Sequence, residues 1–143
     1  MKKILLAIDG SESCNKAINT TVELAEKWAA NVTIINVIDE SLDSVAFSRE
    51  QAEEVVEKKK ELDQEHEDIV VSCANLFNND LIEVNEITRE GHPAEEICKE
   101  ADNGDYDLII VADMGKSSIK KFLLGSTTEK VVRFSNKSVL VVK

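Results

Sequence analysis

The stretch Lys2–Gly10, KKILLAIDG, decides the fold class of this chain. Its apolar run from Ile4 to Ile8 is too short for a membrane span or the apolar region of a secretory signal. A short apolar run that stops at Asp9 and is followed by Gly10 and Ser11 is typical of a buried strand, a turn and a helix N-terminus. The sequence therefore predicts a buried strand over residues 2–9 and a helix over 13–30.

The same alternation of strand and helix continues to the end of the chain. Apolar runs predict further strands over 31–39, 81–88, 106–113 and 138–142, and helical spacing predicts helices over 48–79, 94–103 and 126–134. Short strands that are almost continuously apolar are typical of a parallel sheet with helices on both faces. Right-handed crossovers then give a doubly wound α/β fold. We expect one domain over residues 1–143, with a five-stranded parallel sheet in the order 3-2-1-4-5.

Composition disfavours several classes of partner. The chain has 143 residues and 43% hydrophobic residues, and its 28 acidic and 17 basic residues give a net charge of -11. Such a charge repels nucleic acid and anionic membrane surfaces, so we expect neither as a partner. Cys14, Cys73 and Cys98 are widely spaced and form no C-x-x-C motif, which predicts neither a disulfide framework nor a metal site. We expect a reducing, cytoplasmic location.

Two glycines mark a candidate phosphate site. Gly115 follows the strand over 106–113, and Gly125 and Ser126 begin the last helix, where free N–H groups and the helix dipole favour an anion. GKS at 115–117 is not the end of a P-loop, because Ile110 stands where that motif needs glycine. From the residues alone, a strand exit and a helix cap explain both glycines at least as well.

Four segments in this order, KKILLAIDGSE, REGHPAEEI, YDLIIVADMG and LLGSTTEKVVRFSNKSVLVV, resemble the universal stress protein family over essentially the whole chain. Nucleotide-binding members of that family carry the pattern G-x2-G-x9-G-[ST]. Here the pattern lies on Ala112, Gly115, Gly125 and Ser126, and only Ala112 departs from it.

The resemblance implies an ATP site, possibly with Mg2+. It places the adenosine near Ala7 and Asp9, with Val37 lining the adenine pocket. It places the phosphates at Gly115, Gly125, Ser126 and Thr127. Ala112 adds a methyl group where the family pattern has glycine, which we expect to adjust or weaken the site. Asp113 would repel phosphate unless Mg2+ or Lys116 offset its charge.

Other polar residues give weaker signals. His66 falls on or beside the apolar stripe of the helix over 48–79, and His92 lies in a turn, so neither predicts a catalytic triad. Cys14 lies near a helix N-terminus, where a thiolate is favoured. Lys116, Lys120 and Lys121 form a solvated cluster that could attract ATP. No residue is predicted to be catalytic, and ATP hydrolysis would be slow at most.

The sequence leaves three hypotheses for function. The first is a cytoplasmic regulatory or stress-response protein that binds ATP, and the second is a dimeric interaction module of the same family without a nucleotide. The third, a phosphoacceptor receiver domain, needs an acceptor aspartate where 81–88 ends in Thr88 followed by Arg89. The strand over Ser138–Val142 would lie at the edge of the sheet, so we expect a homodimer through it.

Overall fold

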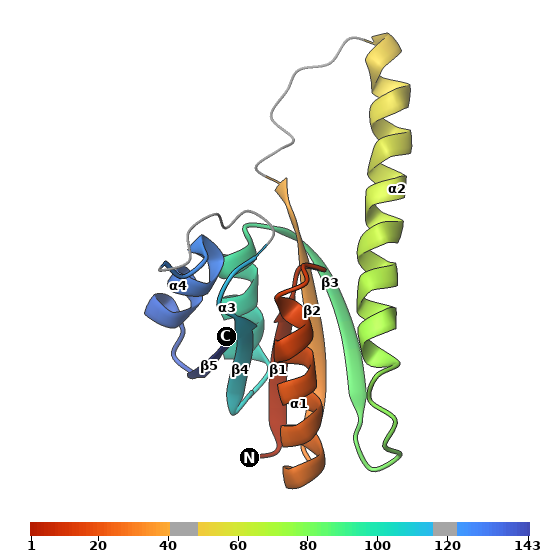
Figure 1. Ribbon diagram of the computed structural model, residues 1–143. Helices are drawn as coiled ribbons and strands as arrows, with labels where there is room; N and C mark the ends of the chain where they lie inside the picture. The colour runs from red at the N-terminus through yellow and green to blue at the C-terminus, as the bar shows by residue number, and fades with distance from the viewer. Residues whose placement is uncertain (41–48, 116–122) are drawn as a thin grey trace.

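The computed structural model describes residues 1–40, 49–115 and 123–143, with backbone alone at 49–51. Its strands are β1 (Lys3–Ile8), β2 (Asn31–Asp39), β3 (Val84–Gly91), β4 (Leu108–Ala112) and β5 (Ser138–Val142). Its helices are α1 (Cys14–Trp28), α2 (Arg49–Ala74), α3 (Pro93–Asn103) and α4 (Ser126–Phe134). The strands form one sheet in the order β3-β2-β1-β4-β5 (Figure 1). All its pairs are parallel, so the predicted fold class and strand order are confirmed.

Both faces of the sheet are buried, because side chains alternate along each strand. On β1, Ile4, Leu6 and Ile8 pack into one hydrophobic cluster. Leu5 and Ala7 pack into a second cluster on the opposite face. Burial on both faces explains why this strand reads as an unbroken apolar run in the sequence.

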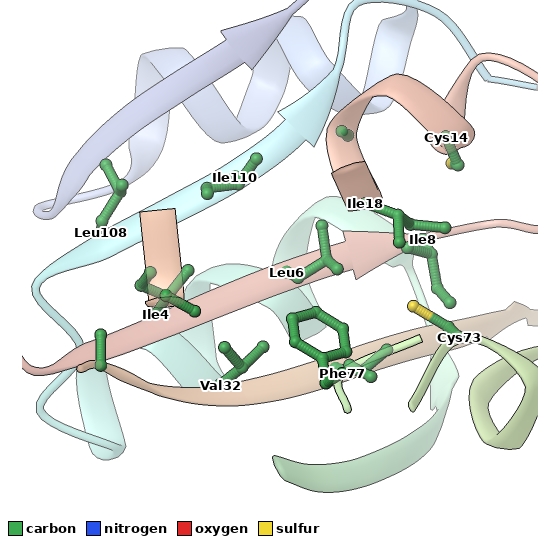
Figure 2. Packing of buried hydrophobic residues seen from close by; sticks show 14 of the residues in the cluster. Ile4, Leu6, Ile8, Cys14, Ile18, Val32, Cys73, Phe77, Leu108 and Ile110 are labelled. Carbon is green, nitrogen blue, oxygen red and sulfur yellow. The ribbon is translucent and has the colours of Figure 1, made fainter. Parts of the chain in front are cut away.

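Two helices cover each face of the sheet. The cluster that contains Ile4 is closed by α1 and α2, with Cys14, Ile18 and Cys73 among the contributing residues (Figure 2). The opposite cluster is closed by α3 and α4 through Ile97 and Val131, among others. The fold is therefore three-layered, with the sheet between two helical layers.

The turn between β1 and α1 fits closely against α2. Gly10 has φ of +75°, a conformation that side chains disfavour, and a Cβ atom there would lie 2.6 Å from Cδ1 of Ile69. Glycine at this position therefore allows both the turn and the approach of the helix.

The end of one predicted helix and both ends of one predicted strand were wrong by three residues or more. The helix expected to reach Asn79 ends at Ala74, and the N–H groups of Leu76 and Phe77 donate to carbonyls three residues back, as in turns. Phe77 is still buried, which is why the apolar spacing continued past the helix. The strand expected over 81–88 runs from Val84 to Gly91, because β3 pairs with β2 from Val32 as far as Asp39.

The carboxyl ends of the strands meet at one edge of the sheet, at the top in Figure 1. The amino-terminal part of α2 rises past this edge. Among the described residues, no helix is long and apolar enough to cross a membrane.

Candidate functional site

A cavity of about 400 Å³ lies at the carboxyl edge of the sheet. It is lined from β1, β2 and β4, from the beginning of α4, and from α2 and α3 on either side of the sheet. All eight residues that the sequence predicted for the site line this cavity: Ala7, Asp9, Val37, Ala112, Gly115, Gly125, Ser126 and Thr127. The fold thus brings together residues from four separate segments of the chain.

Asp9 follows the last residue of β1 and is held on one side by its own turn. Its Oδ1 accepts hydrogen bonds from the backbone N–H of Ser11 at 2.9 Å and from the thiol of Cys14 at 3.1 Å. Ser13, not Asp9, is the N-cap residue of α1. Asp9 therefore closes the turn before α1 and does not cap the helix itself.

Gly115 lies directly against Asp9. A Cβ atom at Gly115 would be 2.6 Å from Oδ2 of Asp9, closer than any real contact of such atoms. Its φ is not positive, so space rather than backbone conformation explains the glycine. The backbone of Gly115 can approach a ligand that also touches Asp9.

Gly125 brings the start of α4 to the same place. Its N–H donates to the carbonyl of Asp113 at 2.7 Å, and a Cβ atom on it would be 3.3 Å from the backbone nitrogen of Gly115. Its φ of -57° is one that any residue can adopt, so here too space rather than backbone conformation explains the glycine. The first N–H groups of α4, at Ser126 and Thr127, have no acceptor within the helix and carry the positive end of its dipole.

Hydrogen bonds from side chains fix the two glycines in place. The hydroxyl of Thr128 donates to the carbonyl of Ala112 at 2.7 Å, which ties α4 to the end of β4. The hydroxyl of Ser13 donates to the carbonyl of Met114, also at 2.7 Å, which ties α1 to the residue before Gly115. The arrangement is a preformed, glycine-lined recess at a helix N-terminus.

The charges of the recess differ from the sequence prediction. Asp113, which we expected to repel phosphate, is not among the residues that line the cavity. The carboxylates that do line it belong to Asp9 and Asp39. Lys116, Lys120 and Lys121 lie outside the described residues. Within the described ranges, no group of His, Cys, Asp and Glu side chains could hold a metal ion.

Two residues of the site were missed by sequence reasoning. His66, which was interpreted as part of the apolar stripe of α2, lines the cavity, and its Nδ1 is hydrogen-bonded to Oδ1 of Asn36. Asn36 is completely buried in the middle of β2 and donates from Nδ2 to the carbonyl of Ile8 at 2.8 Å. An asparagine inside the apolar run IINVID was the available signal, since a buried amide needs polar partners.

The remaining candidates behave differently. His92 is exposed at the N-cap of α3 and does not line the cavity. Cys14 lines it, but burial raises the pKa of its thiol above the ordinary value of 9.0, although a hydrogen bond from Ser11 opposes the shift. The thiol form of Cys14 is therefore favoured, because desolvation outweighs the nearby helix N-terminus.

The sequence and the fold match known proteins over their full length. The profile of the universal stress protein family matches residues 1–143. Universal stress protein MJ0577 from Methanocaldococcus jannaschii is 35% identical over 99% of this chain and 94% of its own length. Universal stress protein YxiE from Bacillus subtilis is 31% identical, over 99% of this chain and 98% of its own. The solved structure of MJ0577 superposes with a TM-score of 0.84, over 99% of this chain and 95% of that one.

Two solved structures with lower identity share the fold and contain a nucleotide. A universal stress protein from Archaeoglobus fulgidus in complex with dAMP has 19% identity and a TM-score of 0.63, over 100% of this chain and 98% of that one. A universal stress protein in complex with cAMP has 22% identity and a TM-score of 0.64, over 99% and 95%. With the family profile and both relatives matched across the whole length, this chain belongs to the universal stress protein family.

Proposed function

We propose that this protein binds ATP, with Mg2+ as counterion, in the cavity at the carboxyl edge of the sheet. It would act there as a nucleotide-dependent regulatory or stress-response protein of the cytoplasm. The observation that carries the proposal is the mutual approach of Gly115, Gly125 and Asp9, which leaves bare backbone beside a carboxylate and a helix N-terminus. The cAMP and dAMP complexes of related proteins support a nucleotide as the ligand class.

The two ends of the cavity suit the two ends of the ligand. Val37 and Ile97 offer apolar surface from β2 and α3 for a base, and Asp9 offers acceptors for ribose hydroxyls. Ser126 and Thr127 offer N–H groups and hydroxyl donors for phosphates, and Gly125 leaves room for them to approach. The methyl group of Ala112 is buried at the end of β4, where it narrows the recess without placing a charge in it.

A homodimer through β5 is the second part of the proposal. β5 pairs with β4 on one side only, so the described sheet has an edge there. Exposed apolar side chains lie on α4 and just before it, namely Leu123, Leu124, Val132 and Phe134. An open strand edge next to apolar surface favours association with a second copy. This surface also supports the alternative function, an interaction module that works without nucleotide.

Calorimetric titration of ATP and Mg2+ into wild type and Gly125→Val tests the binding proposal. A branched side chain at Gly125 would fill the space beside Gly115, so we expect the affinity to fall by at least about tenfold, near the loss of one charge-assisted hydrogen bond. Lys130→Val is the matched control, because Lys130 is exposed on the same helix and away from the cavity. A folded wild type that does not bind ATP would leave the interaction module as the function.

A further inference from the structure

The hydrogen bonds of Asn36 determine which ring nitrogen of His66 carries a proton. The carbonyl of Ile8 can only accept, so the amide group of Asn36 must direct Nδ2 toward it, as the 2.8 Å bond shows. Oδ1 of Asn36 is then the atom that meets Nδ1 of His66, and an amide oxygen also can only accept. Nδ1 therefore donates, and Nε2 is the nitrogen that gains or loses the titrating proton.

The same bonds fix the position of the imidazole. Asn36 is completely buried and joins His66 to the carbonyl of the residue before Asp9. His66 therefore lies at the β1–β2 end of the cavity, and both His66 and Asp9 line it. A helix side chain held by a buried amide is a fixed part of the wall rather than a solvated group.

The ionisable side chains that line the cavity determine the charge of its wall. Among the described residues that line the cavity, the ionisable groups are Asp9, Asp39, His66 and the thiol of Cys14. No lysine or arginine is among these lining residues. Protonation of His66 is therefore the change by which the described wall can gain a positive charge near neutral pH.

The described elements that pack around His66 carry several acidic residues. Asp9 follows β1, Asp39 ends β2, and α2 itself carries Asp63, whose Oδ1 is buried without a hydrogen-bond partner among the described residues. On β3, two acidic residues face α2: Glu90 pairs with Lys59 at 3.6 Å, and Glu86 acts electrostatically on Cys73. Of the carboxylates on β3, Glu90 is partly offset by its ion pair with Lys59.

We propose that His66 makes nucleotide binding depend on pH, with the protonated imidazole favouring the bound state. The inference rests on the proposed function, because the ligand must be an anionic nucleotide for the charge to act in this direction. A protonated His66 partly offsets Asp9 and Asp39 and so lowers the repulsion that the phosphates meet. Linkage then requires the reciprocal effect, in which bound nucleotide raises the pKa of His66.

The test compares ATP affinity at about pH 6 and about pH 8.5, on either side of the ordinary histidine pKa. Wild type, His66→Gln and His92→Gln are titrated with ATP and Mg2+ at constant ionic strength. Glutamine at position 66 keeps an N–H donor for Asn36 but cannot titrate, and His92→Gln is the matched control at an exposed position outside the cavity. The terminal phosphate of ATP also titrates in this range, but it does so in all three experiments. The ratio of the ATP affinities of two proteins therefore isolates the effect of His66.

We expect wild type and His92→Gln to bind ATP about three- to tenfold more tightly, relative to His66→Gln, at the lower pH than at the higher one. Wild type contains two histidines, so its imidazole proton resonances give a second readout. The resonance absent from His66→Gln should titrate at higher pH when nucleotide is bound.

The outcomes separate this inference from the proposed function. ATP binding with the same pH dependence in wild type and His66→Gln would overturn the role of His66 and leave the nucleotide site in place. An unchanged His66 titration upon ATP binding would overturn it in the same way. Absence of ATP binding to folded wild type at both pH values would overturn the proposed function, and the proton linkage with it.

Discussion

The carboxylate of Asp9 is held from one side by the turn into α1 and approached from the other by Gly115. Ser11 and Cys14 donate to Oδ1, whereas Oδ2 occupies the space that a Cβ atom on Gly115 would need. A substitution at Gly115 would therefore act on the ligand site through Asp9, since the flexible end of that side chain is what must move.

We predict that Gly115→Ala weakens ATP binding by about tenfold or more while lowering the free energy of unfolding by less than about 1 kcal/mol. The methyl group displaces the Asp9 carboxylate and also stands where phosphate would approach. Calorimetry and urea denaturation give the two quantities. In an Asp9→Ala background the same change should cost less binding energy, and full additivity of the two substitutions would contradict the proposed coupling.

Thr128 is the residue that ties α4 to the end of β4. Its side chain is buried and its hydroxyl donates to the carbonyl of Ala112 at 2.7 Å. We predict that Thr128→Val lowers the free energy of unfolding by about 1–2 kcal/mol, because a buried carbonyl loses its donor at nearly constant volume. Urea denaturation measures the loss. Thr128→Ser, which keeps the hydroxyl, should retain most of the stability; equal losses in both variants would show that packing dominates.

At the scale of residues, the sequence predicted the lining of the cavity but not its electrostatics. Strand ends and glycines leave local signals, the family resemblance added the residues near the adenosine, and every residue so predicted lines one cavity. The contact between Asn36 and His66 joins residues 30 positions apart on a strand and a helix, so no local pattern contains it. The raised pKa of Cys14 likewise depends on burial, which spacing alone does not reveal.

At the scale of elements, alternate residues of β5 direct their backbone polar groups to opposite sides, toward β4 or away from the sheet. In a parallel strand, the N–H and C=O groups of one residue point to the same side. The carbonyl of Val142 accepts from Asp113 on the β4 side, so Leu140 also faces β4, whereas the backbone polar groups of Val139 and Val141 face outward. Outward groups are free to pair with a second chain if the protein dimerises there.

We therefore predict that Val141→Pro gives a folded monomer, because proline removes an outward N–H and leaves the pairing with β4 intact. Leu140→Pro is the matched substitution one residue away. It removes an N–H directed at β4 and should lower the stability of the monomer itself. Light scattering after size exclusion, with thermal unfolding, distinguishes the two effects. A wild type that is monomeric at micromolar concentration would contradict the dimer proposal.

Element types were easier to predict than some of their ends. β2, α4 and β5 have the predicted bounds, since capping residues and abrupt changes of hydropathy mark them. The end of α2 was placed too late because Phe77 keeps the helical spacing from a turn. The end of β3 was placed too early because its last pairs, up to Gly91 with Asp39, are set by the neighbouring strand.

At the scale of the whole molecule, buried thiols and a buried phenol link stability to alkaline pH. Desolvation raises the pKa of Cys73 from 9.0 to about 12 and is also the main cause of the raised pKa of Cys14. Burial raises the pKa of Tyr106 above 10.0 as well. The folded protein therefore keeps protons that the unfolded chain releases, and unfolding becomes coupled to proton release.

The sign of this linkage predicts a loss of stability at high pH. Below about pH 9 the thiols are protonated in both the folded and the unfolded state, so they cause no loss of stability. As the pH rises toward about 12, the unfolded chain loses these protons before the folded protein does and is progressively favoured. Urea midpoints measured from about pH 8 to about pH 11 should fall, and Cys73→Ala should fall less steeply from its own starting value. Equal slopes in both proteins would show that Cys73 does not carry the effect.

The central claim is that the glycine-lined recess at the carboxyl edge of the sheet binds an adenine nucleotide. The most direct test is a crystal structure of the protein grown with ATP and Mg2+. The account predicts phosphates against the backbone of Gly115 and the first turn of α4, and ribose beside Asp9. ATP bound elsewhere, for example in the groove between α1 and α2 lined by Ile18 and Ile69, would contradict the claim.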